Sequence, residues 1–379
     1  TDAIVKLTAS AICGTDLHMV RGTMAGMKPG RILGHEGVGV VAELGREVRN
    51  FRKGDRVVVG STIGCGYCSY CRAGCYAQCD NANPNGPETA FYGGPEDSGG
   101  FDGMQAEYVR VPFAAINMVK LPDEVADDEA ILISDIFPTG YMAAEMASIC
   151  AGRSVAVFGC GPVGQFAIAS AMLMDAGRVI AIDVIPSRLE MARAQGAEVI
   201  DYNRENPVEV LKNLTGGIGV DRAIDAVGVD ANAPGSGPAK ASAAEHKGEK
   251  DEVAPRQKPE HGNWEPGNAP SIVLDWAVES LAKAGTLSII GVYPPTVKRF
   301  PIGQAMNKNL TVKMANCNHR AYIPRLLEMV RTGAVDPTRV LTQAGPLTGA
   351  LEAYEHFDRR EAGWVKVMLE LSPAPARAA

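Results

Sequence analysis

One short stretch, Val155–Gly164, most restricts what this chain can fold into. It reads Val-Ala-Val-Phe-Gly-Cys-Gly-Pro-Val-Gly, so an apolar run typical of a buried strand leads directly into Gly-x-Gly-x-x-Gly. In such a turn Gly159 permits the tight bend and Gly161 lets the backbone approach a pyrophosphate. Gly164 lets the next helix pack closely against its strand. The stretch therefore predicts a strand–turn–helix unit that binds a dinucleotide, with an ordinary glycine turn as the alternative.

The segment after the turn supports this interpretation. A helix is predicted over 162–175, and with Pro162 and Val163 at its start it offers free N–H groups and a partial positive charge to phosphates. The next strand ends on Asp183, about 20 residues past the last glycine, where a carboxylate can accept from a ribose 2′-hydroxyl. Because that carboxylate repels a 2′-phosphate, we expect NAD rather than NADP, although Arg188 could offer a phosphate a partner.

From residue 153 the chain alternates strands and helices, as a doubly wound parallel α/β sheet does. The predicted strands are 153–159, 178–182, 198–201, 220–226 and 286–292, and the predicted helices are 162–175, 186–195, 207–214 and 271–283.

A polar insertion, 229–270, interrupts this alternation directly after a parallel strand. Ligands of open parallel sheets bind outside the carboxyl ends of the strands, so the insertion is placed to fold over the adenosine half of NAD. The alternative is a disordered loop. Order-favouring residues lie near its ends, whereas 245–260 is charged and expected to be mobile; the order-favouring residues are Pro234, Pro238, Trp264 and Pro266.

The first third of the chain has a different sequence pattern. Strand-like runs joined by polar turns predict a small barrel there. Between these runs lie Cys13 and the pair His35-Glu36. Thiolate, imidazole and carboxylate are all ordinary zinc ligands, but a buried cysteine or a core histidine is the commoner explanation for each alone. Asp135 lies inside an apolar stretch, where a carboxylate must be paired or bind a metal; a helix cap or a salt bridge is the plainer interpretation.

Five closely spaced cysteines form the densest group of candidate metal ligands in the chain, namely Cys65, Cys68, Cys71, Cys75 and Cys79. With Cys79 as the fourth ligand they predict a closed tetrahedral zinc site. With Cys75 instead, the spacing is that of an iron–sulfur run, although Tyr76 stands where that run has proline. Free thiols or disulfides are the third possibility.

Composition excludes several classes. A net charge of −7 argues against nucleic acid as a main partner, and no apolar run approaches the ~20 residues of a membrane span. We expect no signal peptide before Thr1, and nine cysteines in a chain of 379 residues favour metal or thiol roles in a reducing compartment. We therefore expect a cytoplasmic protein of two domains.

These motifs together resemble those of zinc-dependent medium-chain alcohol dehydrogenases. The resemblance extends over nearly the whole chain and rests on Cys13-Gly-Thr-Asp-x-His18, Gly34-His-Glu-Gly37, the spaced cysteines, Pro138-Thr-Gly140 and the glycine turn. The run Ser134–Gly140 and the insertion are more narrowly similar to the glutathione-independent formaldehyde dehydrogenases.

The resemblance implies roles for individual residues. Cys13, His35 and Asp135 would hold a catalytic zinc, with a water or substrate oxygen in the fourth position, and Glu36 would approach the metal when water leaves. The zinc would act as a Lewis acid. Asp16 would orient the imidazole of the histidine ligand.

The remaining implied roles concern proton transfer, the second metal and the cofactor. Thr15 would take the alcohol proton and His18 would pass it to solvent, while a hydride moves to the nicotinamide. Cys65, Cys68, Cys71 and Cys79 would hold a structural zinc, giving two zinc ions per chain. The insertion would help to retain NAD.

The implied architecture is a GroES-like β-barrel from 1–137 and 303–379, around a Rossmann domain at 138–302, with the active site in the cleft between them. Only twelve residues precede Cys13, fewer than the family usually has, so the opening strands are expected to be short or missing. We expect a homo-oligomer that oxidises a small alcohol or aldehyde with NAD. The alternatives are an aldehyde dismutase with tightly bound NAD and a non-catalytic NAD-binding protein on the same fold.

Overall fold

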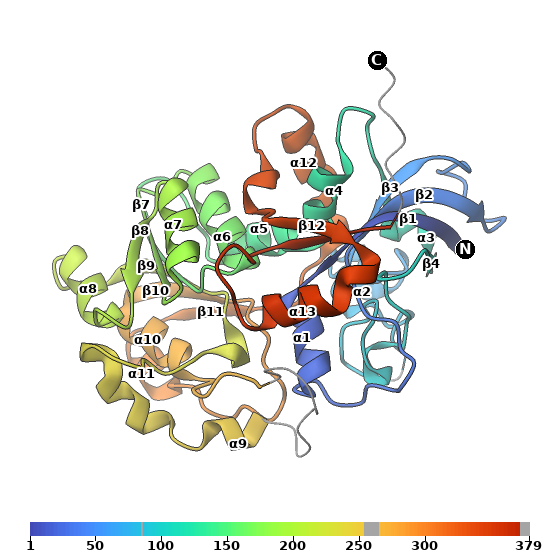
Figure 1. Cartoon of the computed structure of the whole chain (residues 1–379). Helices are drawn as coiled ribbons and strands as arrows, with labels where there is room; N and C mark the ends of the chain where they lie inside the picture. The colour runs from blue at the N-terminus through green and yellow to red at the C-terminus, as the bar shows by residue number, and fades with distance from the viewer. Residues whose placement is uncertain (85, 254–264, 372–379) are drawn as a thin grey trace. The chain divides into compact units, whose positions relative to one another are not determined.

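The computed structural model describes residues 1–84, 86–253 and 265–371 (Figure 1). The chain divides into two compact units. One unit combines Thr1–Pro138 with Asn316–Ala379, and the other is the continuous segment Thr139–Ala315.

The continuous unit is built on a six-stranded parallel sheet. Its strands are β6 (Ser154–Phe158), β7 (Arg178–Asp183), β8 (Glu198–Asp201), β9 (Val220–Asp225), β10 (Leu281–Ile289) and β11 (Thr311–Met314). They lie in the order β11-β10-β9-β6-β7-β8, so the direction of winding reverses between β6 and β9. That reversal defines a doubly wound Rossmann sheet, as the sequence predicted.

Side chains alternate between the two faces of this sheet, and each face has its own helices (Figure 1). Val155 and Val157 of β6 contribute to the core under α5, α6 and α7, whereas Ala156 and Phe158 contribute to the core under α8, α10 and α11. The bounds of these helices are Ile136–Met146 (α5), Pro162–Leu173 (α6), Pro186–Ala194 (α7), Pro207–Leu214 (α8), Ile272–Ser280 (α10) and Ile302–Asn307 (α11). Strands buried on both faces explain the nearly continuous apolar runs in the sequence.

The largest boundary differences from the sequence prediction lie around β10 and at the end of this unit. Helix α10 ends at Ser280 rather than at 283, because Leu281 already pairs with Val220 of β9. The register shifts before Thr286, where the regular pairing expected for 286–292 begins. The unit also continues to Ala315, beyond 302, since β11 is hydrogen-bonded to β10.

The other unit holds a seven-stranded mixed sheet. Its strands are β1 (Ala3–Ile12), β2 (Gly37–Leu44), β3 (Arg56–Val59), β4 (Tyr108–Val111), β5 (Met118–Lys120), β12 (Gln343–Pro346) and β13 (Val367–Glu370). Its helices are α1 (Gly14–Arg21), α2 (Ser69–Arg72), α3 (Ala114–Asn117), α4 (Asp127–Ile133), α12 (His319–Arg331) and α13 (Ala350–Asp358).

This unit is the GroES-like domain that was expected. The strand pairings among the described residues, however, do not close its sheet into a barrel. The order runs β12-β13-β1-β2-β3-β5, with β4 branching from β1. One edge of β1 is shared, because Ala3–Lys6 pairs with β4 whereas Ala9–Ile12 pairs with β13. Along one edge, strand β1 therefore pairs first with β4 and then with β13, and the order of strands branches there.

The insertion is structured over its described part. Residues 245–253 were expected to be mobile. They lie in the end of a 3₁₀-helix (Pro238–His246), a turn at 247–248 and α9 (Glu249–Val253). Residues 254–260 of that charged segment and Trp264 lie outside the described residues.

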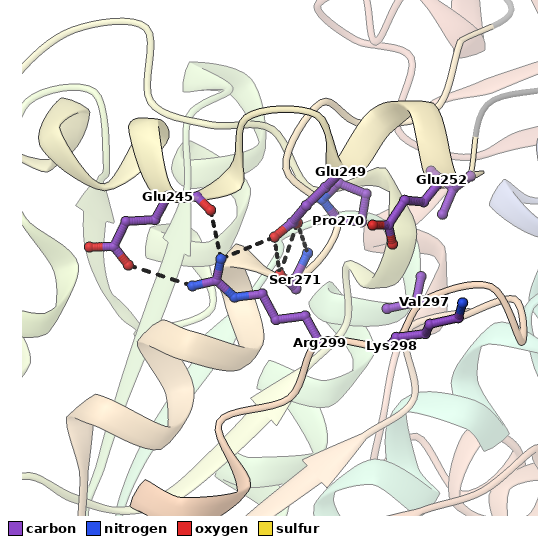
Figure 2. Close-up of a pocket in the computed structure, with 9 residues that line it drawn as sticks. Glu245, Glu249, Glu252, Pro270, Ser271, Val297, Lys298 and Arg299 are labelled. Carbon is purple, nitrogen blue, oxygen red and sulfur yellow. Dashed lines mark hydrogen bonds and ion pairs between the residues drawn. The ribbon is translucent and has the colours of Figure 1, made fainter.

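Charged contacts hold α9 against the rest of its unit (Figure 2). The Glu249 carboxylate accepts from the backbone N–H of Ser271 at 3.1 Å and from its hydroxyl at 2.8 Å. Arg299 donates to the Glu245 carbonyl at 2.6 Å and to Asp275 at 2.8 Å. These partners, Ser271, Asp275 and Arg299, all follow the insertion in sequence, so its described part is anchored to the segment after it. No helix within the described ranges is both long and apolar enough to span a membrane.

Candidate metal centres and cofactor site

Four of the predicted site residues converge in the unit that holds the mixed sheet. One ligand atom from each of Cys13, His35, Glu36 and Asp135 lies within 4.8 Å of the other three, and all four residues are buried. Cys13 directly precedes α1, His35 and Glu36 directly precede β2, and Asp135 lies between α4 and α5. Segments up to 122 residues apart therefore contribute to one cluster.

Asp135 is positioned by its two oxygens. Its Oδ2 lies 3.5 Å from Cys13 Sγ and 3.3 Å from His35 Nε2. Its Oδ1 lies 2.7 Å from His319 Nε2. Although burial by itself raises the pKa of this carboxyl, hydrogen bonds from His319 and His35 hold the pKa well below its ordinary value. Both oxygens of Asp135 therefore contact side chains, as the salt-bridge interpretation expected.

Asp16 of α1 supports two of the other members. Its Oδ1 lies 3.0 Å from His35 Nδ1, and its Oδ2 accepts from the backbone N–H of Cys13 at 2.9 Å. This is the contact to the imidazole that the family resemblance implied. Burial lowers the pKa of His35, but Asp16 and Cys13 outweigh it and raise that pKa well above its ordinary value. Burial raises the pKa of the Cys13 thiol.

Two further residues contact the cluster, and sequence reasoning missed both. His319 is the first residue of α12, and Lys366 directly precedes β13. Burial disfavours the charged imidazole, yet Cys317 and Asp135 raise the pKa of His319 to about 10. A signal existed for Lys366, since it is a lone charge inside the apolar run Val365–Leu369. The same signal had singled out Asp135.

Lys366 forms an ion pair with Glu36, and neither side chain is exposed at all. Its Nζ also donates to the Ile12 carbonyl at 3.0 Å. Burial raises the pKa of Glu36 to about 7, although Lys366 opposes the shift. The pair occupies Oε2 of Glu36, while the buried Oε1 has no hydrogen-bond partner among the described residues.

The two predicted relay residues, Thr15 and His18, lie one turn apart on α1, which begins directly after Cys13. His18 is buried and Thr15 is partly buried. The structure thus places both residues on the helix that carries a cluster member at its start.

The second cluster is confined to one loop. Sγ atoms of Cys65, Cys68, Cys71 and Cys79 lie within 4.8 Å of one another, and no disulfide joins cysteines of the described ranges. Cys75 is exposed and is not part of the group, which disfavours the iron–sulfur spacing. Backbone N–H groups of the same loop donate to these sulfurs; the donors are Cys65, Tyr67, Cys68, Cys71 and Ala82.

The glycine turn of the other unit has the geometry that its sequence predicts. Gly159 has a φ of +89°, and a Cβ there would lie 2.5 Å from Val227. A Cβ on Gly164 would lie 1.9 Å from the Gly159 carbonyl oxygen, so α6 packs closely against β6. A Cβ on Gly161 would meet only Arg188 Nη1, at 3.6 Å. No protein atom therefore requires glycine at 161, and the open space suits the close approach of a phosphate.

Other residues of this turn are also where the prediction put them. Pro162 and Val163 form the first turn of α6, and Gly161 is its N-cap. Asp183, the last residue of β7, accepts from the backbone N–H of Cys160 at 2.8 Å, which ties the strand end to the glycine turn. Its other oxygen accepts from the backbone of the next two residues.

The family profiles match two separate parts of the chain. The profile of the alcohol dehydrogenase GroES-like domain matches residues 1–123, and that of the zinc-binding dehydrogenases matches 162–235. These segments contain both candidate metal clusters except Asp135, and only the last three residues of the glycine turn, 162–164.

Relatives match over greater lengths. The chain is 37% identical over 373 residues to the uncharacterized zinc-type alcohol dehydrogenase-like protein AdhB of Bacillus subtilis, covering 97% of this chain and 93% of that protein. It is 38% identical over 295 residues to the glutathione-independent formaldehyde dehydrogenase of Pseudomonas aeruginosa, covering 76% of this chain and 67% of that enzyme.

A solved structure agrees with these matches. The alcohol dehydrogenase TADH from Thermus sp. ATN1 superimposes with a TM-score of 0.79 at 33% identity, covering 98% of this chain and 92% of that chain. Fold, profiles and full-length relatives thus converge, and the chain belongs to the zinc-type alcohol dehydrogenase family of oxidoreductases.

Proposed function

We propose that this protein transfers a hydride between NAD and a small alcohol or aldehyde, with the help of a zinc ion. The proposal rests on the buried convergence of Cys13, His35, Glu36 and Asp135 in a chain of a zinc-type dehydrogenase family. Thiolate, imidazole and carboxylate are zinc ligands, and three protein ligands leave an open position for a substrate. A non-catalytic protein would need no such convergence.

The donors fit a catalytic zinc on this geometry. Cys13, His35 and Asp135 would hold the ion, and the unpartnered Oε1 of Glu36 is a buried oxygen that a nearby cation would satisfy. Zinc at this position supplies a Lewis acid for the oxygen of the substrate. Asp16 keeps the His35 ring in the orientation that directs Nε2 towards the cluster.

The proton released by an alcohol needs a path, and α1 offers one. We assign the first acceptor to the hydroxyl of Thr15 and the next to the imidazole of His18. Their spacing of three residues puts both side chains on neighbouring turns of one helix face. Replacing His18 with Gln should therefore slow turnover more at low pH than at high pH, where solvent base can substitute.

NAD is the proposed cofactor, bound through Gly159–Gly164 and Asp183. A carboxylate offers about four acceptor sites, and three backbone N–H groups already donate to Asp183. Its Oδ2 accepts only one of them and so retains capacity for a ribose hydroxyl. Arg188 lies near Gly161 and is the residue that could favour a 2′-phosphate instead. We expect the kcat/KM for NAD to exceed that for NADP by about tenfold or more, which corresponds to ~1.4 kcal/mol.

Replacing Asp183 with Gly should narrow this preference, and the ratio of the two kcat/KM values measures it. Replacing Arg188 with Ala is the matched change on the opposing side and should widen the ratio. A wild-type protein that uses NADP as well as NAD would refute the assignment.

Cys65, Cys68, Cys71 and Cys79 would hold a second zinc as a closed structural site. Four thiolates leave no open position, so this ion would contribute to folding and not to chemistry. The backbone donors around the sulfurs stabilise the thiolate form that zinc requires.

The substrate and the fate of NADH need a direct assay. Short alcohols and aldehydes should be supplied with NAD, and both net NADH and the paired alcohol and acid products of dismutation should be measured. Net NADH supports a dehydrogenase, whereas equal amounts of alcohol and acid without NADH support the dismutase. Zinc-replete protein that is inactive with the whole panel would contradict both.

The insertion bears on this choice, because a cofactor that leaves slowly favours dismutation. It leaves the sheet after Asp225, at the carboxyl end of β9, and α9 is anchored through Glu249 and Arg299. We propose that it slows NAD release. Replacing 232–266 with a short glycine linker should then speed the exchange of bound NAD, and an unchanged exchange rate would leave the insertion as a surface segment only.

A homo-oligomer is proposed from the outer edge of the parallel sheet. Strand β11 is last in the strand order, so one of its edges lacks a partner strand among the described residues. Ile302, Met306 and Met314 nearby in sequence are 73%, 78% and 65% exposed. Unpaired strand edges and exposed apolar side chains favour association with a second copy. Light scattering of wild type and of Met306→Glu tests this, and a monomeric wild type would refute it.

A further inference from the structure

His319 is fixed against one oxygen of Asp135. Its Nε2 lies 2.7 Å from Asp135 Oδ1, and both residues are buried. The contact has the length of a hydrogen bond, and an N–H at Nε2 is the donor that a carboxylate oxygen can accept from.

The far side of the His319 ring is held as well. Its Nδ1 lies 3.0 Å from Thr62 Oγ1, and that hydroxyl also lies 2.9 Å from the Cys317 carbonyl, to which it can donate. The backbone N–H of Thr62 also lies 3.4 Å from Nδ1. Both ring nitrogens therefore have partners, and these contacts fix the orientation of the imidazole.

Because of this contact, the two oxygens of Asp135 have different partners. Oδ1 faces His319, whereas Oδ2 faces Cys13 Sγ and His35 Nε2. A carboxylate that is free to turn can bind a metal through both oxygens and fill a position that a substrate needs. A carboxylate with one oxygen engaged elsewhere binds through the other alone.

We propose that His319 is a positioning residue, which restricts Asp135 to one-oxygen coordination of the zinc and so preserves the open position for the substrate; this rests on the proposed function. Partners of metal ligands in general orient the ligand and contribute about 10–100-fold to metal affinity. Here a histidine from 316–379 orients a ligand at 135, so that segment takes part in the metal site.

Metal retention tests the inference without any turnover. His319→Leu removes the donor, whereas His319→Gln keeps an N–H on a side chain of similar reach. His356→Leu, in α13, is the matched control outside the cluster. Each folded protein is challenged with a chelator, and zinc is counted over time.

The four-cysteine site acts as an internal reference, because it should hold its zinc in every variant. We expect His319→Leu to release one of its two zinc ions about 10–100-fold more readily than wild type. His319→Gln should release zinc at a rate between those of His319→Leu and wild type, and His356→Leu should release it as wild type does. Equal retention of both ions in His319→Leu and wild type would overturn the inference.

Cobalt(II) placed in the catalytic site reports coordination directly through its visible absorption, which depends on ligand number and geometry. His319→Leu should show the weaker absorption of a higher coordination number, and His319→Gln a spectrum nearer to wild type. An unchanged spectrum in His319→Leu would contradict the positioning role even if the affinity fell. If wild type itself binds metal only at the four cysteines, the proposed function fails, and this inference fails with it.

Discussion

The two candidate metal sites of this chain are supported in opposite ways. Cys65, Cys68, Cys71 and Cys79 lie within one loop. Among the described residues, the N–H donors to their sulfurs come almost entirely from the backbone of that loop. The other cluster takes its members from three distant segments, and its supports are the side chains of Asp16, His319 and Lys366. A closed site can thus be built locally, whereas a site that must stay open is held by the surrounding fold.

The largest effect should come from breaking the local site. Cys68→Ser removes a ligand from a closed tetrahedral set, and structural zinc in such sites binds with about 10 kcal/mol or more, which is available to folding. We expect a protein that loses one zinc and unfolds at a much lower temperature, as measured by circular dichroism on heating.

Cys75→Ser is the matched control, because that thiol is exposed in the same loop but lies outside the tetrad. It should leave both zinc content and unfolding temperature unchanged. If the two variants behave alike, the tetrad is not the metal site.

The next effect concerns turnover rather than folding. His35→Ala removes a ligand of the open site, and the Lewis-acid contribution of several kcal/mol would be lost with the metal. We expect kcat/KM to fall by about 1,000-fold or more while the unfolding temperature changes little. If the unfolding temperature of His35→Ala fell as far as that of Cys68→Ser, the proposed difference between the two clusters would be wrong.

A third change tests the distant support of the open site. Lys366→Met leaves Glu36 as a buried carboxylate without its partner, and breaking a buried ion pair costs about 3–5 kcal/mol. Urea unfolding should show this loss. The double variant Glu36→Gln with Lys366→Met should recover much of it, and equal stability of the single and double variants would count against the pairing.

The smallest effect should come from a side-chain amide that donates to the tetrad. Asn81 Nδ2 lies 3.3 Å from Cys65 Sγ and belongs to an exposed residue. Because the backbone supplies the other donors, Asn81→Ala should cost about 1 kcal/mol or less. A loss as large as that of Lys366→Met would mean that the local site also depends on side chains.

The same contrast explains what the sequence could predict. The tetrad, the glycine turn and the alternating strands and helices are local patterns, and their spacing alone indicates their structure. The family resemblance then supplied Cys13, His35 and Asp135, which no spacing connects.

The sequence did not predict the roles of His319 and Lys366, because their partners lie 184 and 330 residues away in sequence. Tertiary pairing of that kind leaves only a weak trace, such as a lysine within an apolar run. The open edge of the mixed sheet escaped for a similar reason, since β1 changes partner from β4 to β13 along one edge and neither partner is near it in sequence.

Zinc content of wild type and His35→Ala, measured by elemental analysis on folded protein, tests the two-site account most directly. We predict two zinc ions per chain in wild type and one in His35→Ala, with the remaining ion lost only when Cys68 is also replaced by Ser. A wild-type protein that oxidises an alcohol or aldehyde with one zinc or none would contradict the account.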